Sequence, residues 1–396
     1  MPYSYSRKKD ISSRILELLG FILLTPMNAF RKPSSLSNPA SFLIVEPFQM
    51  GDLISVTVLL DPLKKRFPAS RICLLTKPGN VGVLSSDPRV EKIISADFPW
   101  SDYGTKRGSL KRWWNLTKAL FRLRKYNFEV GIDCRGDIRS QLIMVIAGCR
   151  NRIGYTNYLN SNLNVQGLLL TRRVTTPPYN HRFDWNAYIL TALGLQEQEL
   201  IPVAFPTLKL PQTHRVFQHA ASQYILVHIG GGWQYKRWPA SNWITLINRL
   251  TEKYKYPIKL VAGPAEKDLL KHITDALTSK NIVSGILPSL EELVVLIHGS
   301  SLFLGLDSGP MNIAVALNKS VIALFGPGDS ATWYPYQASS AFIHKKELFP
   351  CSPCAQTICY YPEKNCMASI SVAEVEQTVS DFLEKAVGPA ANRTSL

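Results

Sequence analysis

The segment Ser301–Asp329 alternates between apolar and glycine-containing stretches, and it restricts the fold more than any other part of the chain. Two short apolar runs, Leu302–Leu306 and Val321–Phe325, are typical of parallel strands that are covered on both faces. Between them, Pro310 suits the first turn of a helix, where a missing N–H costs nothing. The sequence therefore predicts strand, turn, helix and strand, the repeating unit of an α/β fold with a parallel sheet.

The turn after the first of these strands has the composition of an anion-binding site. Asp307 stands at the carboxyl end of the strand, Ser308 can cap the helix, and Gly309 lets a ligand approach the backbone. The free N–H groups and the dipole of a helix N-terminus attract phosphate. An Asp-Ser-Gly turn can also be only a helix cap. However, a second glycine loop, Gly326–Asp329, follows the next strand at the same sheet edge, where open α/β sheets bind ligands. We therefore expect a nucleotide site here.

The length and charge of the chain limit the classes of protein to which it can belong. Its 396 residues suit two domains of ordinary size, and 46% hydrophobic residues are enough for two cores. The formal charge of +16 points to anionic partners: phosphorylated small molecules, anionic lipid or nucleic acid. No zinc-finger spacing and no RNP-like motif is present, so we expect no nucleic-acid partner. Seven cysteines, an odd number, argue against a secreted disulfide framework and favour a reducing cytoplasm.

Residues 1–40 form a basic segment with one apolar run, Ile15–Leu24, which Glu17 and Gly20 interrupt. This run is too short to cross a bilayer. No small-residue cleavage site follows it, which argues against a signal peptide. We expect either an amphipathic segment that lies on an anionic membrane or a helix that packs against the protein. The stretch Arg31–Ser41 then has the composition of a linker.

The first domain is predicted to span residues 41–212 and to open with a strand, a glycine loop and an apolar-periodic helix. Asp52 falls where this loop meets the helix, so it can be an N-terminal cap or, facing a bound sugar, a general base. Arg139, in the first turn of a later helix, is a candidate for contact with an acceptor. His181 starts another helix, where it can cap the helix, pack in the core or contact the acceptor.

A basic stretch with aromatic residues, Thr105–Tyr126, lies inside this domain and includes Trp113 and Trp114. Such a run of charge can be the solvated face of a helix. It can equally be a surface that meets phosphorylated lipid or a membrane.

A second α/β domain is predicted over residues 222–370, after a connection at Pro202–Gln212. Its first strand, Tyr224–His228, runs into a glycine loop that exposes backbone N–H groups to an anion. The three consecutive glycines are Gly230, Gly231 and Gly232.

Two basic residues follow this loop. Lys236 and Arg237 add mobile and forked positive charge that would hold a diphosphate and stabilise it as it leaves. Glu266, after the next strand, could accept hydrogen bonds from ribose hydroxyls or be only a partner of a helix dipole. The glycines match neither a GxGxxG turn nor a Walker loop, so neither hydride transfer nor ATP hydrolysis is indicated.

The C-terminal part contains a cysteine-rich segment, residues 351–366, and then a predicted helix over residues 371–387. Four thiolates at the spacing C-x2-C-x4-C-x6-C could hold a structural zinc ion. Reduced thiols and a disulfide are the alternatives. The cysteines are Cys351, Cys354, Cys359 and Cys366.

Six blocks of this sequence occur in the order seen in the ADP-heptose:lipopolysaccharide heptosyltransferase family, glycosyltransferase family 9, which the chain resembles from about Phe42 to about Val379. They are MGDLISVTVLLDPLKKRFP, DCRGDIRSQL, GGGWQYKRWP, LDSGPMNIAVAL, ALFGPGD and the cysteine segment ending CMASIS; KRWP and DSGPM are the most specific. The resemblance implies a GT-B fold, in which two Rossmann-like domains face each other across a cleft. The first would bind the acceptor and the second the nucleotide-sugar, and the final helix would cross back to the first domain.

The resemblance also implies roles for individual residues. Asp52 matches the base that deprotonates the acceptor hydroxyl, which then attacks the anomeric carbon with inversion. Lys236 matches the residue that steadies the departing diphosphate. The donor-binding turn of the family is matched by Asp307, Ser308 and Gly309.

Two further positions are weaker matches to the family pattern. Glu266 is a looser match to a nucleotide-contacting carboxylate. Asn312 stands where the family usually has a histidine, so a hydrogen-bond donor is kept and any positive charge is lost. The chain has no Asp-x-Asp pair for a catalytic divalent ion, and we expect no cofactor to be required for catalysis.

The sequence thus predicts an inverting, metal-independent glycosyltransferase on the cytoplasmic face of the inner membrane. Its expected partners are a nucleotide-sugar donor such as ADP-heptose, a lipopolysaccharide core or other lipid-linked glycan acceptor, and an anionic membrane surface. One alternative is a nucleotide-sugar epimerase or hydrolase with the same fold. Another is a catalytically silent nucleotide-sugar-binding subunit, which Asn312 favours and which Asp52 and Lys236 oppose.

Overall fold

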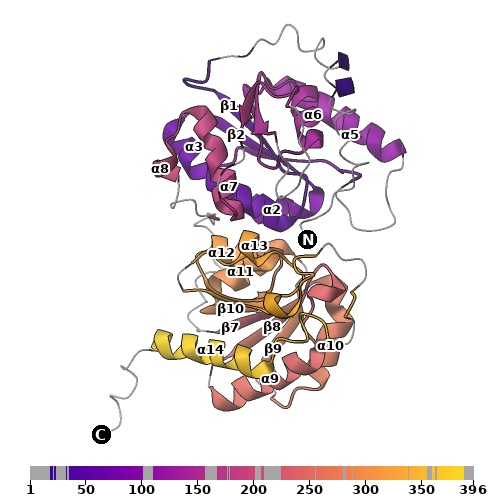
Figure 1. Ribbon diagram of the computed structural model, residues 1–396, viewed down its shortest axis with the longest axis vertical. Helices are drawn as coiled ribbons and strands as arrows, with labels where there is room; N and C mark the ends of the chain where they lie inside the picture. Colours follow the sequence, from indigo (N-terminus) through magenta and orange to yellow (C-terminus); the bar gives the residue numbers. More distant parts are fainter. Residues whose placement is uncertain are drawn as a thin grey trace. The chain divides into compact units, whose positions relative to one another are not determined.

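The structure, a computed structural model, divides the chain into two compact units, Pro2–Gln212 and Thr213–Leu396 (Figure 1). The described residues are 18–20, 22–23, 33, 35–100, 110–156, 167–175, 177, 179–200, 207–208, 224–254, 256–279, 282–287, 289–337, 339–354, 359–361 and 364–387. The predicted basic N-terminal segment and the predicted connection at residues 202–212 therefore fall mostly outside the described residues.

The N-terminal unit contains one parallel sheet of six strands in the order β3-β2-β1-β4-β5-β6. Strands β1 and β4 are buried along their whole length, which explains the continuous apolar run Phe42–Val45 in β1. The strands are β1 (Ser41–Val45), β2 (Arg71–Thr76), β3 (Lys92–Ser95), β4 (Val130–Asp133), β5 (Asn151–Tyr155) and β6 (Arg172–Val174). The helices are α2 (Met50–Ser55), α3 (Leu60–Arg66), α4 (Val81–Leu84), α5 (Leu110–Arg122), α6 (Ile138–Ile146), α7 (Arg182–Tyr188) and α8 (Glu197–Leu200), with 3-10 helices η2 (Val56–Leu59), η3 (Pro78–Asn80), η4 (Leu123–Tyr126) and η5 (Ile189–Leu193).

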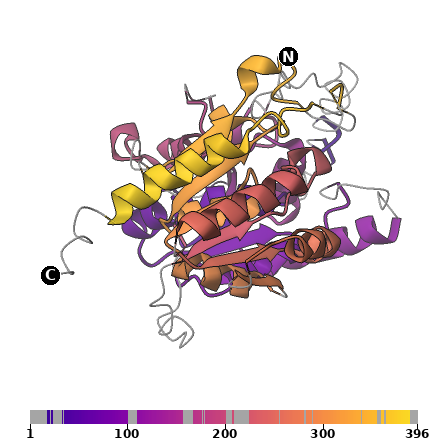
Figure 2. The ribbon, with the colours of Figure 1, turned by 90° about the horizontal axis from the view of Figure 1, so that it is seen from below.

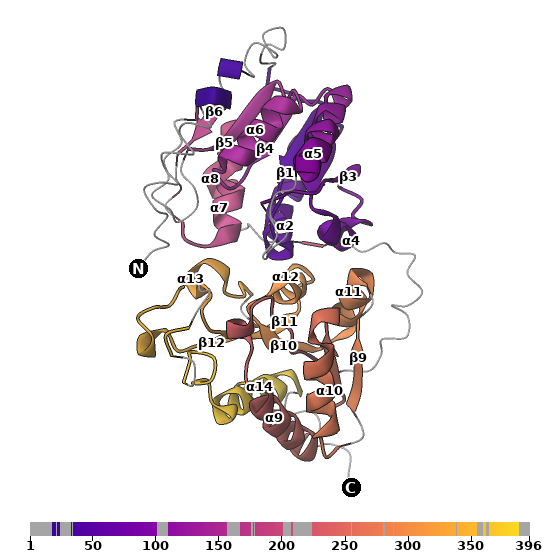
Figure 3. The ribbon, with the colours of Figure 1, turned by 90° about the vertical axis from the view of Figure 1, so that its right-hand side faces the viewer.

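The C-terminal unit contains a second parallel sheet of six strands, in the order β12-β11-β10-β7-β8-β9. Figure 3 shows β12 and β9 at opposite edges of this sheet, with β10 and β11 between them. The strands are β7 (Ile225–His228), β8 (Ile258–Ala262), β9 (Ile282–Ile286), β10 (Leu302–Leu306), β11 (Ser320–Phe325) and β12 (Ala341–His344). The helices are α9 (Ala240–Lys253), α10 (Lys267–Asp275), α11 (Leu290–Gly299), α12 (Gly309–Ala316), α13 (Ser330–Trp333) and α14 (Val372–Val387), with 3-10 helices η7 (Gln234–Lys236), η8 (Pro264–Glu266) and η9 (Lys346–Leu348). The strands and helix predicted within Ser301–Asp329 are confirmed.

Both sheets have the same topology. Numbered within its own unit, each has the order 3-2-1-4-5-6, which is the Rossmann order. The order reverses between β1 and β4 in the first sheet and between β7 and β10 in the second. The carboxyl ends of the strands at such a switch point form the crevice in which doubly wound folds bind ligands. The sequence places Asp52 after β1 and Asp307 after β10, so both candidate residues lie beside a switch point.

Helix α14 packs along α9 within the C-terminal unit (Figure 2). Val375, Val379 and Leu383 are buried and spaced four residues apart, so they form one stripe that joins the core of this unit. The predicted crossing of this helix to the first domain stays a prediction. In the part of the chain that the structure describes, no helix has the length and hydropathy to cross a membrane.

Candidate active site

Asp52 lies in the first turn of α2, where both of its carboxylate oxygens have partners. The backbone N–H of Gln49 donates to Oδ2 over 3.1 Å, which is half of a capping box. The Arg135 guanidinium donates through Nη1 to Oδ1 over 2.7 Å. Arg135 comes from the turn between β4 and α6, so this contact connects the segments that follow the two strands of the switch point, β1 and β4. Asp52 is therefore a helix cap whose second oxygen an arginine orients, and its role as a base stays a prediction.

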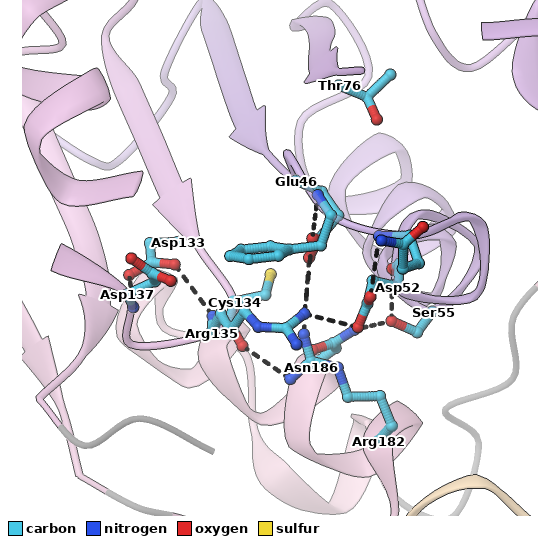
Figure 4. Close-up of polar contacts among 12 residues, drawn as sticks. Glu46, Asp52, Ser55, Thr76, Asp133, Cys134, Arg135, Asp137, Arg182 and Asn186 are labelled. Carbon is cyan, nitrogen blue, oxygen red and sulfur yellow. Dashed lines mark hydrogen bonds and ion pairs between the residues drawn. The ribbon is translucent and has the colours of Figure 1, made fainter. Parts of the chain in front are cut away.

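A second carboxyl group, that of Glu46, is buried beside Asp52 directly after β1. Its Oε1 lies 3.9 Å from Nη1 of Arg135, and its Oε2 lies 3.6 Å from Nη2 of Arg182, which has no exposed side-chain surface. Figure 4 shows both carboxyl groups on either side of the Arg135 guanidinium. The sequence analysis did not single out these three residues. In the sequence, these residues could have been noticed only as charged residues that stand next to apolar strands or within an otherwise apolar helix.

The two carboxyl groups have pKa values that their surroundings push apart. Burial raises the pKa of Glu46 to about 8, and the neighbouring Asp52 adds to this effect. Burial also raises the pKa of Asp52, but the charges of Arg135 and Arg182 outweigh it and hold the pKa below its ordinary value. At neutral pH the cluster therefore contains a charged Asp52 and a mostly neutral Glu46. When two neighbouring carboxyl groups have pKa values this far apart, one can act as a proton acceptor while the other stays protonated.

Glu46→Gln is expected to make the unfolding free energy of the N-terminal unit less dependent on pH. A carboxyl whose pKa is higher in the folded than in the unfolded state binds more protons when folded. Raising the pH from the ordinary value of 4.5 to about 8 therefore destabilises the wild type. Glutamine stays neutral, so the variant should gain a few kcal/mol relative to wild type between pH 5 and pH 8, at ~1.4 kcal/mol per pKa unit.

Urea denaturation at both pH values measures this difference. Glu91→Gln is the matched control, because Glu91 is exposed and pairs with Arg71 over 3.7 Å. An equal stability difference between Glu46→Gln and wild type at pH 5 and pH 8 would contradict the assignment of a neutral Glu46.

Arg139 lies in the first turn of α6, close to this cluster. Its Nε donates to Oδ1 of Asp137 over 2.9 Å, and its guanidinium lies 5.3 Å from the ring centre of Phe48. The Arg135 guanidinium lies 4.0 Å from the centre of the same ring. Phe48 thus brings together the loop before Asp52 and the two arginines of the β4–α6 region. About a third of the Arg139 side chain is exposed, and its acceptor contact stays a prediction.

His181 serves as a helix cap in the structure. It stands at the N-cap of α7, where its Nδ1 accepts a hydrogen bond from the N–H of Phe183 over 3.3 Å. The side chain is buried and its ring meets Phe183 edge-on. The predicted contact between His181 and an acceptor is not tested by this geometry and stays a prediction.

Lys236 and Asp307, which the sequence singled out separately, are in contact. Nζ of Lys236 lies 2.5 Å from Oδ2 of Asp307 and also donates to the Asp307 backbone oxygen over 3.3 Å. The pair connects the segment after β7 to the segment after β10, the two strands that form the switch point of the second sheet. An ammonium group is thus held at the edge where a phosphorylated ligand would meet the helix N-terminus of α12.

The glycine loop before Lys236 packs tightly on one side. A Cβ on Gly230 would lie 2.8 Å from Cε1 of His228, and one on Gly231 would lie 3.3 Å from a methyl carbon of Leu306. Gly232, in contrast, has no atom within 4 Å of its would-be Cβ. A side chain at position 230 would therefore force His228 to move, one at position 231 would be in tight contact with Leu306, and position 232 has open space beside the loop.

The other predicted donor residues form a second pair and a turn. Nη2 of Arg237 donates to Oε1 of Glu266 over 3.0 Å. Ser308 is the N-cap residue of α12, the position predicted for it, but its hydroxyl donates to the Leu306 oxygen and accepts no hydrogen bond from a helix N–H. Nδ2 of Asn312 donates to the Ser308 oxygen over 3.1 Å, and Gly309 is the first residue of the helix. The Asn312 amide thus supports the turn from inside α12.

Gly328→Ala is expected to destabilise the C-terminal unit by ~1–3 kcal/mol, the cost of overpacking. A Cβ at this position of the GPGD loop would lie 2.0 Å from Oδ2 of Asp307. The Asp307 carboxylate cannot move away without losing Lys236. Thermal unfolding measures the effect, and Gly285→Ala, where the added Cβ meets nothing within 4 Å, is the control. Equal melting temperatures for the two variants would show that the loop does not press on Asp307.

The cysteine-rich segment packs against the GPGD loop. The N–H of Cys354 donates to the Pro327 oxygen over 3.0 Å, and a Cβ on Gly326 would lie 3.3 Å from Sγ of Cys366. All seven cysteines are free thiols, so no disulfide is formed. Among the described residues, which include all four cysteines of the segment, no three His, Cys, Asp or Glu side chains gather to hold a metal ion. Structural zinc stays a prediction.

Comparisons with known proteins agree with this architecture. The sequence model of glycosyltransferase family 9 (heptosyltransferase) matches residues 114–364. Lipopolysaccharide heptosyltransferase 3 of Escherichia coli is 24% identical over 299 residues, which cover 72% of this chain and 83% of that protein. The structure of E. coli ADP-heptose lps heptosyltransferase II has a TM-score of 0.67 at 19% identity and covers 88% of this chain and 100% of its own. E. coli heptosyltransferase WaaC with ADP-2-deoxy-2-fluoro heptose has a TM-score of 0.66 at 18% identity and covers 86% of this chain and 99% of its own.

Two parallel sheets in Rossmann order and the likeness to these structures define an α/β protein with the GT-B fold, as the sequence predicted. This is a fold class of glycosyltransferases. The match of the family model over more than half of the chain is more specific. The chain belongs to glycosyltransferase family 9, and it is a glycosyltransferase.

Proposed function

We propose that this chain is an inverting glycosyltransferase that moves a heptosyl residue from ADP-heptose to a lipopolysaccharide core or a related glycan. The main support is the contact between Lys236 and Asp307 at the second switch point, next to the glycine loop. A relative is named a lipopolysaccharide heptosyltransferase, and a structure with the same fold holds an ADP-heptose analogue. We assign the nucleotide-sugar to the C-terminal unit and the acceptor to the N-terminal unit.

In the proposed reaction, Asp52 accepts the proton of the acceptor hydroxyl, and the freed oxygen attacks the anomeric carbon of the sugar. The bond between that carbon and the diphosphate oxygen breaks, and ADP leaves with the electron pair. Gln49 and Arg135 hold the Asp52 carboxylate in place. Its low pKa keeps it charged, and therefore able to accept a proton, at neutral pH.

Stabilisation of the leaving diphosphate is assigned to positive groups of the protein. The Lys236 ammonium lies at the sheet edge, and the loop Gly230–Gly232 offers backbone N–H groups. On this basis we propose that turnover needs no divalent ion. Asn312 supports the donor turn by its hydrogen bond to Ser308 and leaves the charge to Lys236.

We also propose that the enzyme works as a peripheral protein at the cytoplasmic face of the inner membrane. The acceptor of such a reaction is lipid-linked, and the formal charge of +16 suits an anionic surface.

A donor and acceptor panel tests the function. Purified protein is mixed with ADP-heptose and other nucleotide-sugars, each with and without lipopolysaccharide truncated before its heptoses, in the presence and absence of EDTA. The readouts are nucleotide release and the anomeric configuration of the product by NMR. Nucleotide release that requires acceptor, inverts the configuration and survives EDTA is the expected result.

The other outcomes identify the alternatives. Equal nucleotide release or epimerised sugar without acceptor would favour an epimerase or hydrolase and contradict transfer. Donor binding without release would favour a silent binding subunit. Retained configuration would contradict a mechanism with Asp52 as its only carboxylate at the reacting carbon.

A further inference from the structure

Helix α5 has an inner face that accounts for only part of its surface. Leu116 and Leu120 of α5, and Leu123 at the start of the following η4, are buried in the core of the N-terminal unit, where α5 also contacts α6. Figure 1 shows α5 at the outer edge of this unit. The opposite side of the helix takes no part in the core or in the candidate site.

An apolar stripe runs along this opposite side. Leu110, Trp114 and Phe121 are spaced four and seven residues apart, so they project from the same side of the helix. They are 88%, 60% and 40% exposed, and the informative point is that they lie together on one side of the helix rather than singly. Large apolar side chains that gather on an exposed surface mark an interaction site.

A basic stripe lies beside the apolar one. It starts at Lys111 and continues with side chains seven, four and three residues further along, all of them exposed. Within the described part of the chain, none of the four forms an ion pair with a carboxylate, whereas Arg112 on the inner side pairs with Asp97. No acidic residue occurs between Leu110 and Tyr126. The basic stripe consists of Lys111, Lys118 and Arg122 of α5 and Lys125 of the following η4.

We propose that these two stripes, together called the α5 face, bind the headgroup region of an anionic phospholipid bilayer. Leucine, tryptophan and phenylalanine would enter the boundary between headgroups and acyl chains, while the cations beside them meet the lipid phosphates. Nζ of Lys118 lies 5.0 Å from the ring centre of Trp114, so the charge stays next to the aromatic ring as it does at a membrane interface.

The positive charge of the α5 face favours an anionic bilayer over a second copy of the chain as its binding partner. Two copies joined through the α5 face would bring two sets of four unpaired cations together, which like-charge repulsion opposes. An anionic bilayer neutralises the same cations. The inference deepens the proposed function, since it names the surface that would hold the enzyme near a lipid-linked acceptor. It does not depend on which sugar is transferred.

Vesicle co-sedimentation tests the proposal on the full chain. Neutral vesicles contain phosphatidylcholine alone, and anionic vesicles contain phosphatidylcholine with about 30% phosphatidylglycerol. Three sets of substitutions are compared with wild type. The apolar variant carries two substitutions, Trp114→Ser and Phe121→Ser. The basic variant replaces the four cations of the basic stripe: Lys111→Gln, Lys118→Gln, Arg122→Gln and Lys125→Gln. The charge-matched control replaces four lysines elsewhere: Lys65→Gln, Lys267→Gln, Lys271→Gln and Lys346→Gln.

Wild type and control are expected to bind the anionic vesicles and to lose binding in high salt. The basic variant should partition at least about tenfold more weakly, since one cation near an anionic surface is worth roughly fivefold. The apolar variant should also bind more weakly, by about tenfold or more, because each buried aromatic side chain contributes to insertion. All variants should keep the wild-type melting temperature and the wild-type turnover of a water-soluble acceptor fragment.

Three results would overturn the proposal. Wild type could fail to sediment with anionic vesicles, or the control could lose as much binding as the basic variant. A dimer in analytical ultracentrifugation that the apolar variant abolishes would assign the α5 face to a second copy. Absence of turnover in wild type would count against the proposed function only, because vesicle binding is measured separately.

Discussion

Asp52→Asn is expected to lower acceptor-dependent sugar transfer by about 10²–10⁴-fold, the range for loss of a general base. Asparagine has nearly the shape of aspartate, and its amide oxygen can still accept a hydrogen bond from Gln49 or Arg135. It cannot accept the proton of an acceptor hydroxyl. Arg135 still has the Glu46 carboxyl within 3.9 Å, and the pKa of Glu46 falls once the neighbouring Asp52 charge is gone, so Arg135 keeps a carboxyl partner. The loss should therefore appear in kcat and leave the fold intact.

The measurement separates chemistry from binding. Initial rates are measured with saturating donor and acceptor, and donor affinity is measured by calorimetry without acceptor. Donor affinity should stay within about twofold of wild type, because the proposed donor groups lie in the other unit. Asp97→Asn is the matched control, since it removes another carboxylate that pairs with an arginine, Arg112.

Two outcomes would contradict the role of Asp52. Transfer by Asp52→Asn above a tenth of the wild-type rate would mean that Asp52 only caps α2 and holds Arg135. A variant that lost donor affinity as strongly as it lost transfer would indicate a general structural defect. In that case the calorimetric and kinetic losses would be equal.

The fold could be predicted from the sequence because its central strands are buried on both faces. Such strands are short apolar runs that end at glycine or at a charged residue, as at Leu302–Leu306 before Asp307. A doubly wound fold allows more than one strand order, and the structure shows that both sheets have the Rossmann order. What the sequence did not indicate is where peripheral helices pack. The contact of α14 with α9 depends on Val375 and Val379, which match any apolar surface.

The candidate site was predicted one residue at a time, and its pairings were not. Lys236 and Asp307 are 71 positions apart, and nothing local indicates that they touch. The N-terminal cluster was missed for the same reason: Glu46, Arg135 and Arg182 come from three separate elements. Each alone resembles an ordinary surface charge. Only their burial in one place reveals a network that sets the charge of Asp52.

The second large effect is expected for Lys236→Ala, which should lower kcat by about 10²–10³-fold, the usual cost of removing a group that stabilises developing charge. In the structure the Lys236 ammonium lies 2.5 Å from Asp307, whose side chain is about nine-tenths buried. Removing it leaves that carboxylate without its ion partner at the edge where we place the diphosphate. Donor affinity should therefore fall as well, by repulsion between two negative groups.

A double substitution separates these two effects. Lys236→Ala with Asp307→Asn removes the repelling charge, so donor affinity should recover toward the wild-type value while kcat stays low. This outcome would locate the catalytic effect in the lysine itself, because of the two substituted residues only Lys236 carries a positive charge that can stabilise the leaving diphosphate. Arg249→Ala, which breaks an exposed ion pair with Glu376, is the control for loss of a cation from the same unit. If kcat of Lys236→Ala stayed within threefold of that control, the leaving group would have to be stabilised by the glycine loop and the helix N-terminus of α12 alone.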